Sequence, residues 1–189
     1  MNVPIDISDV ILTTPRLILR PWRTSDLDDL YEYSRVPDLG RMAGWITPEA
    51  VEDSEAVLGM FIRGKSTFAI EYRGRAVGSI GVDRYDETHL PEFDDMRCRE
   101  IGYVLSKDLW GQGLMPEAVS EVVRWLFEEQ DLDLIVCGHF AWNNQSARAQ
   151  EKCGFKYYKT VKLWTDYGTQ EDDMVSILTK EEWTAFKKA

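Results

Sequence analysis

The chain has 189 residues, 44% of them hydrophobic and 29% charged, a composition typical of one globular domain rather than of a disordered or fibrous protein. Its 22 Lys and Arg against 33 Asp and Glu give a net charge of −11. This balance disfavours general binding to nucleic-acid phosphates and suits cationic partners such as amines. The sequence has neither an apolar run of membrane-spanning length nor a basic leader, so it predicts a soluble, cytoplasmic protein with no membrane partner.

The cysteines and histidines are too few and too widely spaced to indicate a disulfide framework or a metal site. Cys98, Cys137 and Cys153 are an odd number without close pairing, and the only histidines are His89 and His139. We therefore predict neither disulfides nor a metal site, and we interpret the cysteines as packing residues.

In the first half of the chain, the pattern predicts a strand at residues 16–20, closed by Pro21. Thr24 then precedes a helix over residues 25–34, with acidic residues in its first turn, and Pro48 opens a second helix. Two alternating segments, residues 66–72 and 75–82, flank Arg73-Gly74 and predict a hairpin.

The second half begins with an acidic loop, residues 86–95, followed by a strand at residues 98–105. An amphipathic helix is predicted at residues 117–130, and the apolar run 134–140 predicts a central strand buried on both faces. Asn143 starts a short helix that ends near Gly154. Strands near 155–165 and 173–178 follow, and Thr179 with Glu182 forms a capping box for a terminal helix. This order of elements predicts a mixed α/β sheet domain.

The most informative segment is LWGQGLMPEA, residues 109–118. Gly111 and Gly113 lie between a predicted strand and a strong helix. Glycines there allow positive φ and let successive backbone N–H groups face one anion, to which the helix N-terminus adds its partial positive charge. The segment therefore indicates a phosphate or pyrophosphate ligand, although a flexible connection explains a lone G-x-G equally well. It lacks the GK[ST] of a Walker loop.

Three motifs in order resemble the GNAT superfamily of acyl-CoA-dependent N-acyltransferases, and within it the RimJ/RimL-like branch of ribosomal-protein N-terminal acetyltransferases. They are TTPRLILRPW at 13–22, EIGYVLSKDLWGQGLMPEA at 100–118 and NNQSARAQEKCGF at 143–155. The resemblance covers about residues 11–180, and it implies one domain over residues 1–189. It also implies a mixed, largely antiparallel sheet flanked by helices, whose central strands splay at the acyl-CoA site. Acetyl-CoA is the implied co-substrate.

The resemblance also assigns the cofactor residues. The family loop Q/R-x-x-G-x-G/A places Trp110, Gly113 and Met115 at its three positions, so Met115 stands where the family has a small residue. Trp110 is equally well interpreted as a packing anchor. Val104 and Leu105 are expected to offer backbone groups to the pantetheine arm and the thioester. Asn143 is expected to contact the pantetheine amides, to cap its helix, or both. The cofactor-binding residues predicted in this way are Val104, Leu105, Trp110, Gly111, Gln112, Gly113, Leu114, Met115 and Asn143.

Two catalytic residues are predicted, Glu100 and Ser146. Glu100, on the strand that leads to the loop, is the candidate base for the acceptor amine, and its alternative role is a surface ion pair with Arg97 or Arg99. Many relatives have a tyrosine that protonates the leaving thiolate, and Gln150 stands at that position here. Ser146 is therefore the next candidate donor, with an ordinary small helix residue as the alternative.

Taken together, the sequence predicts an acetyl-CoA-dependent N-acetyltransferase in which a primary amine attacks the thioester directly. The branch suggests a protein N-terminal α-amine as acceptor. The alternatives are a small-molecule N-acetyltransferase, acting on an antibiotic or a polyamine, and a non-catalytic acyl-CoA-binding module. The acidic loop 86–95 is either solvated surface or a rim that attracts a cationic acceptor. The protein is expected to be a monomer or a homodimer, without nucleic acid as a partner.

Overall fold

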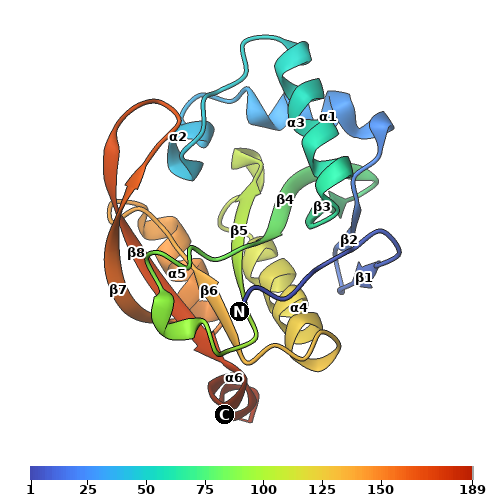
Figure 1. The fold of residues 1–189 in the computed structure, drawn as a ribbon. Helices are drawn as coiled ribbons and strands as arrows, with labels where there is room; N and C mark the ends of the chain where they lie inside the picture. Colours follow the sequence, from blue (N-terminus) through green and yellow to red (C-terminus); the bar gives the residue numbers. More distant parts are fainter. Residues whose placement is uncertain (189) are drawn as a thin grey trace.

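A computed structural model describes residues 1–188, and its strands form one sheet in the order β1-β2-β3-β4-β5-β6-β8-β7 (Figure 1). All neighbouring strands are antiparallel except β5 and β6, which are parallel. The strands are β1 (Leu12–Thr13), β2 (Ile18–Pro21), β3 (Thr67–Tyr72), β4 (Arg75–Asp83), β5 (Cys98–Leu105), β6 (Leu134–Cys137), β7 (Lys156–Trp164) and β8 (Gln170–Thr179). The α-helices are α1 (Leu27–Ser34), α2 (Leu39–Ala43), α3 (Val51–Gly64), α4 (Leu114–Glu128), α5 (Asn144–Lys152) and α6 (Lys180–Phe186). The mixed, largely antiparallel sheet with flanking helices confirms the expected fold class.

Helices cover the two faces of the sheet unequally. The buried side chains of α4 form the main core with one face of β3, β4 and β5, and Phe68 packs edge-on against Trp125 there. On the opposite face, α1 and α3 cover the β3–β4 half of the sheet, while the loop after β4 covers the β6–β8 half. The second face therefore has two separate covers, and a space between them is available for a site.

The central strands separate after a short pairing. The β5–β6 ladder contains only Cys98–Glu100 opposite Leu134–Val136, and β6 ends at Cys137. β5 continues to Leu105 and remains paired with β4 over that length. Residues 101–105 of β5 therefore have a free edge on the side of β6, which confirms the expected splay.

Most predicted elements form close to their predicted bounds. α3 begins at Val51 rather than at Pro48, and three further differences occur. α4 begins at Leu114 rather than at residue 117, because Gly113 adopts a left-handed conformation and Pro116 is tolerated in a first helical turn. β6 ends at Cys137 rather than at residue 140, and only an isolated bridge between Phe140 and Asp173 follows. The short elements β1 and α2 were not predicted from the sequence.

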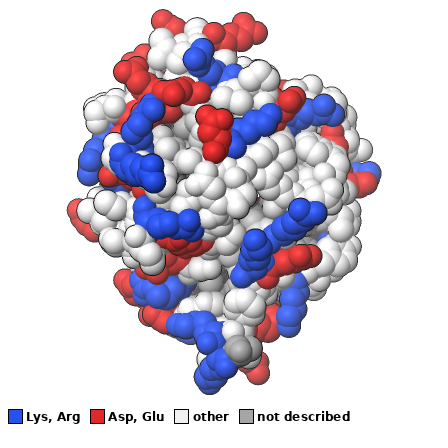
Figure 2. All heavy atoms as spheres, turned by 180° about the vertical axis from the view of Figure 1, so that it is seen from behind, with Lys and Arg blue, Asp and Glu red and all other residues white. Residues whose placement is uncertain are grey.

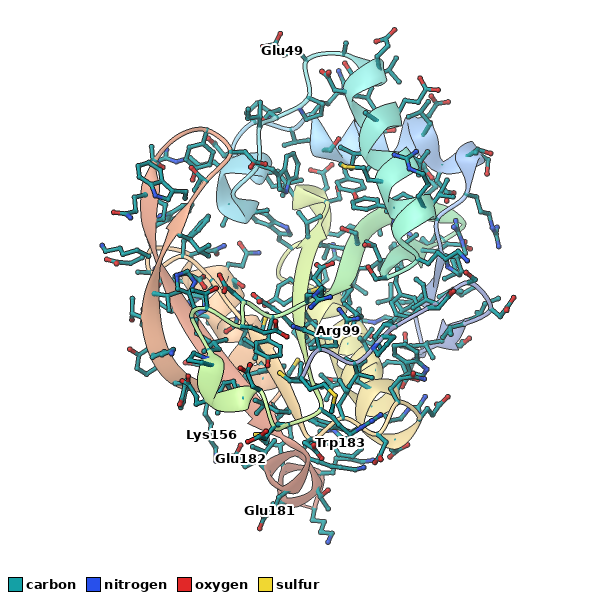
Figure 3. The ribbon with its side chains drawn as sticks, in the orientation of Figure 1. Glu49, Arg99, Lys156, Glu181, Glu182 and Trp183 are labelled. Atoms are coloured by element: carbon teal, nitrogen blue, oxygen red, sulfur yellow. The ribbon has the colours of Figure 1, made fainter. Side chains whose placement is uncertain are left out.

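The chain ends as the capping box predicts. Thr179 Oγ1 accepts a hydrogen bond from the Glu182 N–H, and Glu182 in turn accepts one from the Thr179 N–H. Lys156 on β7 forms an ion pair with Glu182 at 2.9 Å, and both are labelled beside α6 in Figure 3. Among residues 1–188, no helix is both long and apolar enough to span a membrane.

Candidate active site

A cavity of about 1020 Å³ lies along the free edge of β5. Every residue from Glu100 to Leu105 lines it, as do residues 109–111, 113–116 and 138–140 and the first turns of α5. Because successive side chains of a strand point to opposite faces of the sheet, a cavity that contacts all six residues extends around the edge from one face to the other. It therefore has one part on the side of α4 and α5 and another part beneath α2 and α3.

The loop before α4 is built to receive an anion. Gly111 has φ 76° and Gly113 has φ 74°, a left-handed conformation that favours glycine. Within residues 1–188, none of the backbone N–H groups of residues 111–115 has a hydrogen-bond acceptor. Free donors at the N-terminus of a fifteen-residue helix suit a phosphate in chemistry and position, as expected for the pyrophosphate of acetyl-CoA.

Arg16 supports this loop from outside, and the sequence analysis did not single it out. Its guanidinium donates to the Gln112 carbonyl at 2.9 Å and to Glu117 at 2.6 Å. Burial alone would raise the pKa of Glu117, but hydrogen bonds from Thr14 and Arg16 outweigh it and keep that pKa low. The only carboxylate in the first turn of α4 is thus neutralised by Arg16, which removes its repulsion toward a bound phosphate.

The side chains of the loop divide into anchors and free positions. The indole of Trp110 donates to the Leu105 carbonyl at 2.8 Å, so Trp110 fixes the loop to the end of β5 and also lines the cavity. Gln112 is exposed, does not line the cavity and donates through its side chain to the Asp108 carbonyl, so its predicted role in cofactor binding is limited to its backbone N–H. Leu114 and Met115 are both buried and line the cavity.

The backbone groups of Val104 point to β4, and of those of Leu105 only the N–H faces the gap. The Ser106 N–H donates to the Val77 carbonyl, and the alternation of an antiparallel ladder then directs the N–H and C=O of Val104 toward β4. The Leu105 carbonyl accepts from Trp110. The groups that face the gap are those of Tyr103 and the N–H of Leu105, so the expectation for Val104 is wrong for its backbone. Its side chain still lines the cavity.

Asn143 and Ser146 lie where α5 meets the gap. Asn143 is buried, its Oδ1 accepts from the Ser146 N–H at 3.1 Å, and its Nδ2 donates to the Met42 carbonyl at 3.2 Å. It therefore caps α5, ties α2 to that helix and lines the cavity. Ser146 Oγ lies 3.0 Å from the hydroxyl of Tyr103. Burial raises the pKa of Tyr103, so its phenol stays protonated.

Gln150, which occupies the position of the family tyrosine, does not line the cavity. Its amide donates to the Gly138 carbonyl at 3.0 Å, and its Oε1 lies 3.1 Å from His139 Nδ1. Gln150 thus supports the segment that follows β6. Tyr103 is the phenol nearest to Ser146 in the hydrogen-bond network, and it reaches the site from β5 rather than from α5.

Glu100 has no ion pair within the described part of the chain, so its alternative role as a surface ion pair is wrong. Arg97 binds Asp133 and two carbonyls, and Arg99 donates to the Val3 carbonyl where the first residues of the chain cross the sheet (Figure 3). Burial raises the pKa of Glu100 to about 8, assisted by the negative charges of Asp173 and Asp83. A carboxylate with such a pKa is a competent base near neutral pH.

Two further carboxylates line the same cavity. Burial raises the pKa of Asp83, and it raises the pKa of Asp173 to about 6. Neither residue was predicted from the sequence, since a single acid at a strand end carries no pattern. The acidic loop 86–95 lies outside the cavity lining. Its Asp94 accepts from Tyr85, and of its acids only Asp86 acts on Glu100.

The cysteines are all free and buried, which supports their interpretation as packing residues. Burial raises the pKa of Cys98 to about 12 and of Cys153 to about 11, and it raises the pKa of Cys137 as well. None is a thiolate nucleophile at neutral pH. Within residues 1–188, no three His, Cys, Asp or Glu side chains are arranged to hold a metal ion.

Charge is mixed on the face opposite to the view of Figure 1. Figure 2 shows Lys and Arg interspersed with Asp and Glu around a broad uncharged area on that face. The acidic excess of the chain therefore forms no single patch on that face.

Comparison with known proteins agrees with this geometry. Residues 16–156 match the model of the acetyltransferase (GNAT) domain. The chain is 29% identical over 178 residues to the uncharacterized N-acetyltransferase YoaA of Bacillus subtilis, covering 90% of this chain and 97% of that protein. It is also 30% identical over 92 residues to FsC-acetyl coenzyme A-N(2)-transacetylase of Aspergillus fumigatus, which is 47% of this chain but only 39% of that protein.

Solved structures show the same fold. A GNAT-family acetyltransferase from Bacillus anthracis superposes with a TM-score of 0.78 at 20% identity, covering 91% of this chain and 99% of that one. Ribosomal-protein-S5-alanine acetyltransferase from Vibrio fischeri superposes with a TM-score of 0.67 at 18% identity, covering 93% and 99%.

Proposed function

Since this chain belongs to the GNAT family of acetyltransferases, which take their acetyl group from acetyl-CoA, we propose that it transfers that group directly to the α-amine of a peptide. The observation that carries the proposal is the cavity around the free edge of β5, lined by residues from both faces of the sheet. Acetyl-CoA would occupy the side of the 111–115 loop, and the amine would enter on the side of Glu100.

Glu100 begins the reaction in this proposal. Its carboxylate removes a proton from the acceptor ammonium, and the free nitrogen lone pair then attacks the thioester carbonyl carbon. The N–H groups that face the gap, those of Tyr103 and Leu105, are available to the oxyanion of the tetrahedral intermediate. When the C–S bond breaks, Ser146 Oγ–H gives its proton to the leaving sulfur, which departs as the thiol, and Ser146 regains a proton from the attacking nitrogen, which loses its second proton to become the amide N–H. Tyr103 holds Ser146 through the contact between their hydroxyl groups.

A two-step route through an acyl-enzyme has no support in the site. The three cysteines are buried with raised pKa values, and Ser146 contacts Tyr103 rather than a base. Direct attack requires both substrates at once, and a cavity that reaches both faces of the sheet admits both.

The raised pKa of Glu100 favours an α-amine over a lysine side chain as acceptor. A carboxylate with a pKa of about 8 is matched to a peptide α-ammonium near 7.8, so proton transfer between them costs almost nothing. The same transfer from a lysine ammonium near 10.4 costs about 3 kcal/mol. The ribosomal-protein acetyltransferase among the structural neighbours also supports a peptide acceptor.

Thiol release from acetyl-CoA tests the proposal. A peptide with a free N-terminus should be acetylated, whereas the same peptide with a blocked N-terminus and one internal lysine should react at least about a hundredfold more slowly, as the difference in amine pKa requires. If only the blocked peptide is acetylated, the acceptor is a side-chain amine and not the α-amine. Binding of acetyl-CoA without thiol release from any amine would favour the non-catalytic alternative.

A further inference from the structure

A buried carboxylate with no partner projects into the acceptor side of the cavity. Asp173, on β8, is only 5% exposed and lines the cavity. Its carboxylate has no hydrogen bond or ion pair within residues 1–188. Burying a charge without a partner costs free energy, so such a group is typical of a site whose ligand supplies the missing charge.

Asp83 and Glu100 lie on the same side of the sheet as Asp173. They are directly opposite each other on β4 and β5, where side chains of an antiparallel pair are neighbours. Neither carboxylate has a hydrogen bond or ion pair within the described residues. The acceptor side of the cavity therefore contains three carboxylates, Asp83, Glu100 and Asp173, which we call the acidic chamber. Asp173 is buried, Glu100 is half-buried and Asp83 is exposed.

Glycines make room for the acidic chamber. A Cβ on Gly138 would lie 2.5 Å from a carboxylate oxygen of Asp173, and a Cβ on Gly81 would overlap the Asp83 carboxylate. Gly102, between them on β5, has nothing within 4 Å of the position of a Cβ. The two outer carboxylates thus lie against bare backbone, with open space over Gly102 for a ligand.

The reacting amine alone does not balance the charge of the acidic chamber. When Glu100 takes the proton of the ammonium, the reacting nitrogen becomes neutral and Glu100 becomes neutral with it. Asp83 and Asp173 remain charged. Arg99 acts on Asp83 only at a distance. The basic side chain that acts on Asp173 is His89, whose Nδ1 lies 3.0 Å from Asp86 instead.

We propose that the acceptor carries a second positive charge close to its reacting amine, and that Asp83 and Asp173 bind this second cation. The inference rests on the proposed function and narrows its substrate class. An organic dication fits better than a metal ion, because the three carboxylates do not converge to hold one. A lysine or arginine next to the N-terminus of a peptide supplies this chemistry, and so does a free diamine.

Matched acceptors separate the second charge from the reacting amine. We would measure thiol release at low ionic strength with two peptides that differ only at the second residue, lysine in one and norleucine in the other. A second pair, 1,5-diaminopentane and pentylamine, tests the free diamine. The wild-type protein should prefer the doubly charged member by at least about tenfold in kcat/KM in one of the pairs, and that pair identifies the source of the charge.

Two substitutions link that preference to the acidic chamber. In Asp173→Asn and in Asp83→Asn, the preference should fall to about twofold or less. The preference is a ratio of two acceptors on the same variant, so a change in absolute rate through the pKa of Glu100 does not affect it, and a cooperative thermal transition shows that each variant folds. The matched control is Asp172→Asn, which removes a charge from the adjacent, exposed residue of β8 that pairs with Lys162 at 2.6 Å. It should keep the full preference.

Equal use of both members of each pair by the wild-type protein would overturn the inference, as would a preference that survives Asp173→Asn and Asp83→Asn unchanged. Failure of every amine to release thiol would instead overturn the proposed function.

Discussion

Replacing Glu100 by glutamine should remove the base and leave the shape of the cavity intact. General bases contribute about 10²- to 10⁴-fold, so kcat/KM for a peptide acceptor at pH 7 should fall by at least about a hundredfold. The form of the pH profile is the sharper expectation, because the pKa of Glu100 is raised to about 8 by burial and by its acidic neighbours.

In the wild-type protein, kcat/KM requires Glu100 ionised and the acceptor protonated. With pKa values of about 8 and about 7.8, the profile is a bell with its maximum near pH 7.9. The Glu100→Gln variant can use only the neutral amine, so its rate rises to a plateau above pH 8. The loss caused by the substitution should therefore shrink about tenfold between pH 7 and pH 9.

Thiol release measured from pH 6 to pH 9.5 tests whether Glu100 is the base. Glu151→Gln, on the exposed side of α5 and outside the cavity lining, is the matched control and should keep the bell-shaped profile. A loss that is the same at every pH would refute Glu100 as the base and leave it a binding group.

Three other predictions follow from the site. Gly113→Val should weaken acetyl-CoA binding in calorimetry by at least about tenfold, because residue 113 needs a φ of 74°. Gly168→Val, with a similar φ of 81° but outside the cavity lining, should not. Ser146→Ala should lower kcat more than it raises KM, and Tyr103→Phe should lower kcat by a smaller factor. The double variant should be no slower than Ser146→Ala, because Tyr103 acts through Ser146; additive losses would contradict this. Because the folded state raises the pKa of Asp173 to about 6, its charge destabilises the protein fully above pH 6 and not at all below about pH 3.8. Asp173→Asn should therefore raise Tm at pH 7.5, by an amount corresponding to at most about 3 kcal/mol, and leave it unchanged near pH 4.

Local sequence signals located the fold and the donor side of the site. The alternation of residues 98–105, the two glycines at 111 and 113, and the capping box at Thr179 each act over a few residues, and the structure forms all three elements. The short helix α2 escaped detection because five residues carry no period, and its ends depend on left-handed conformations at Asp38 and Gly44.

The acceptor side could not be predicted in the same way. Asp83, Glu100 and Asp173 lie on three strands, and only the register of the sheet places their side chains on one face. Similarly, Tyr103 meets Ser146 across 43 positions of sequence. Such groups are brought together by tertiary structure, which no spacing within one segment reveals.

The free edge of β5 makes the stability of the folded protein depend on the binding of its co-substrate. The amides of Tyr103 and Leu105 have no neighbouring strand on that side. Their hydrogens should therefore exchange with solvent faster than those of other central-strand amides that are equally buried. A ligand that fills the gap binds the folded chain alone, and at a hundred times its Kd it adds about 2.7 kcal/mol to the free energy of unfolding. The lifetime of the enzyme against proteolysis would then follow the supply of acetyl donor in its surroundings.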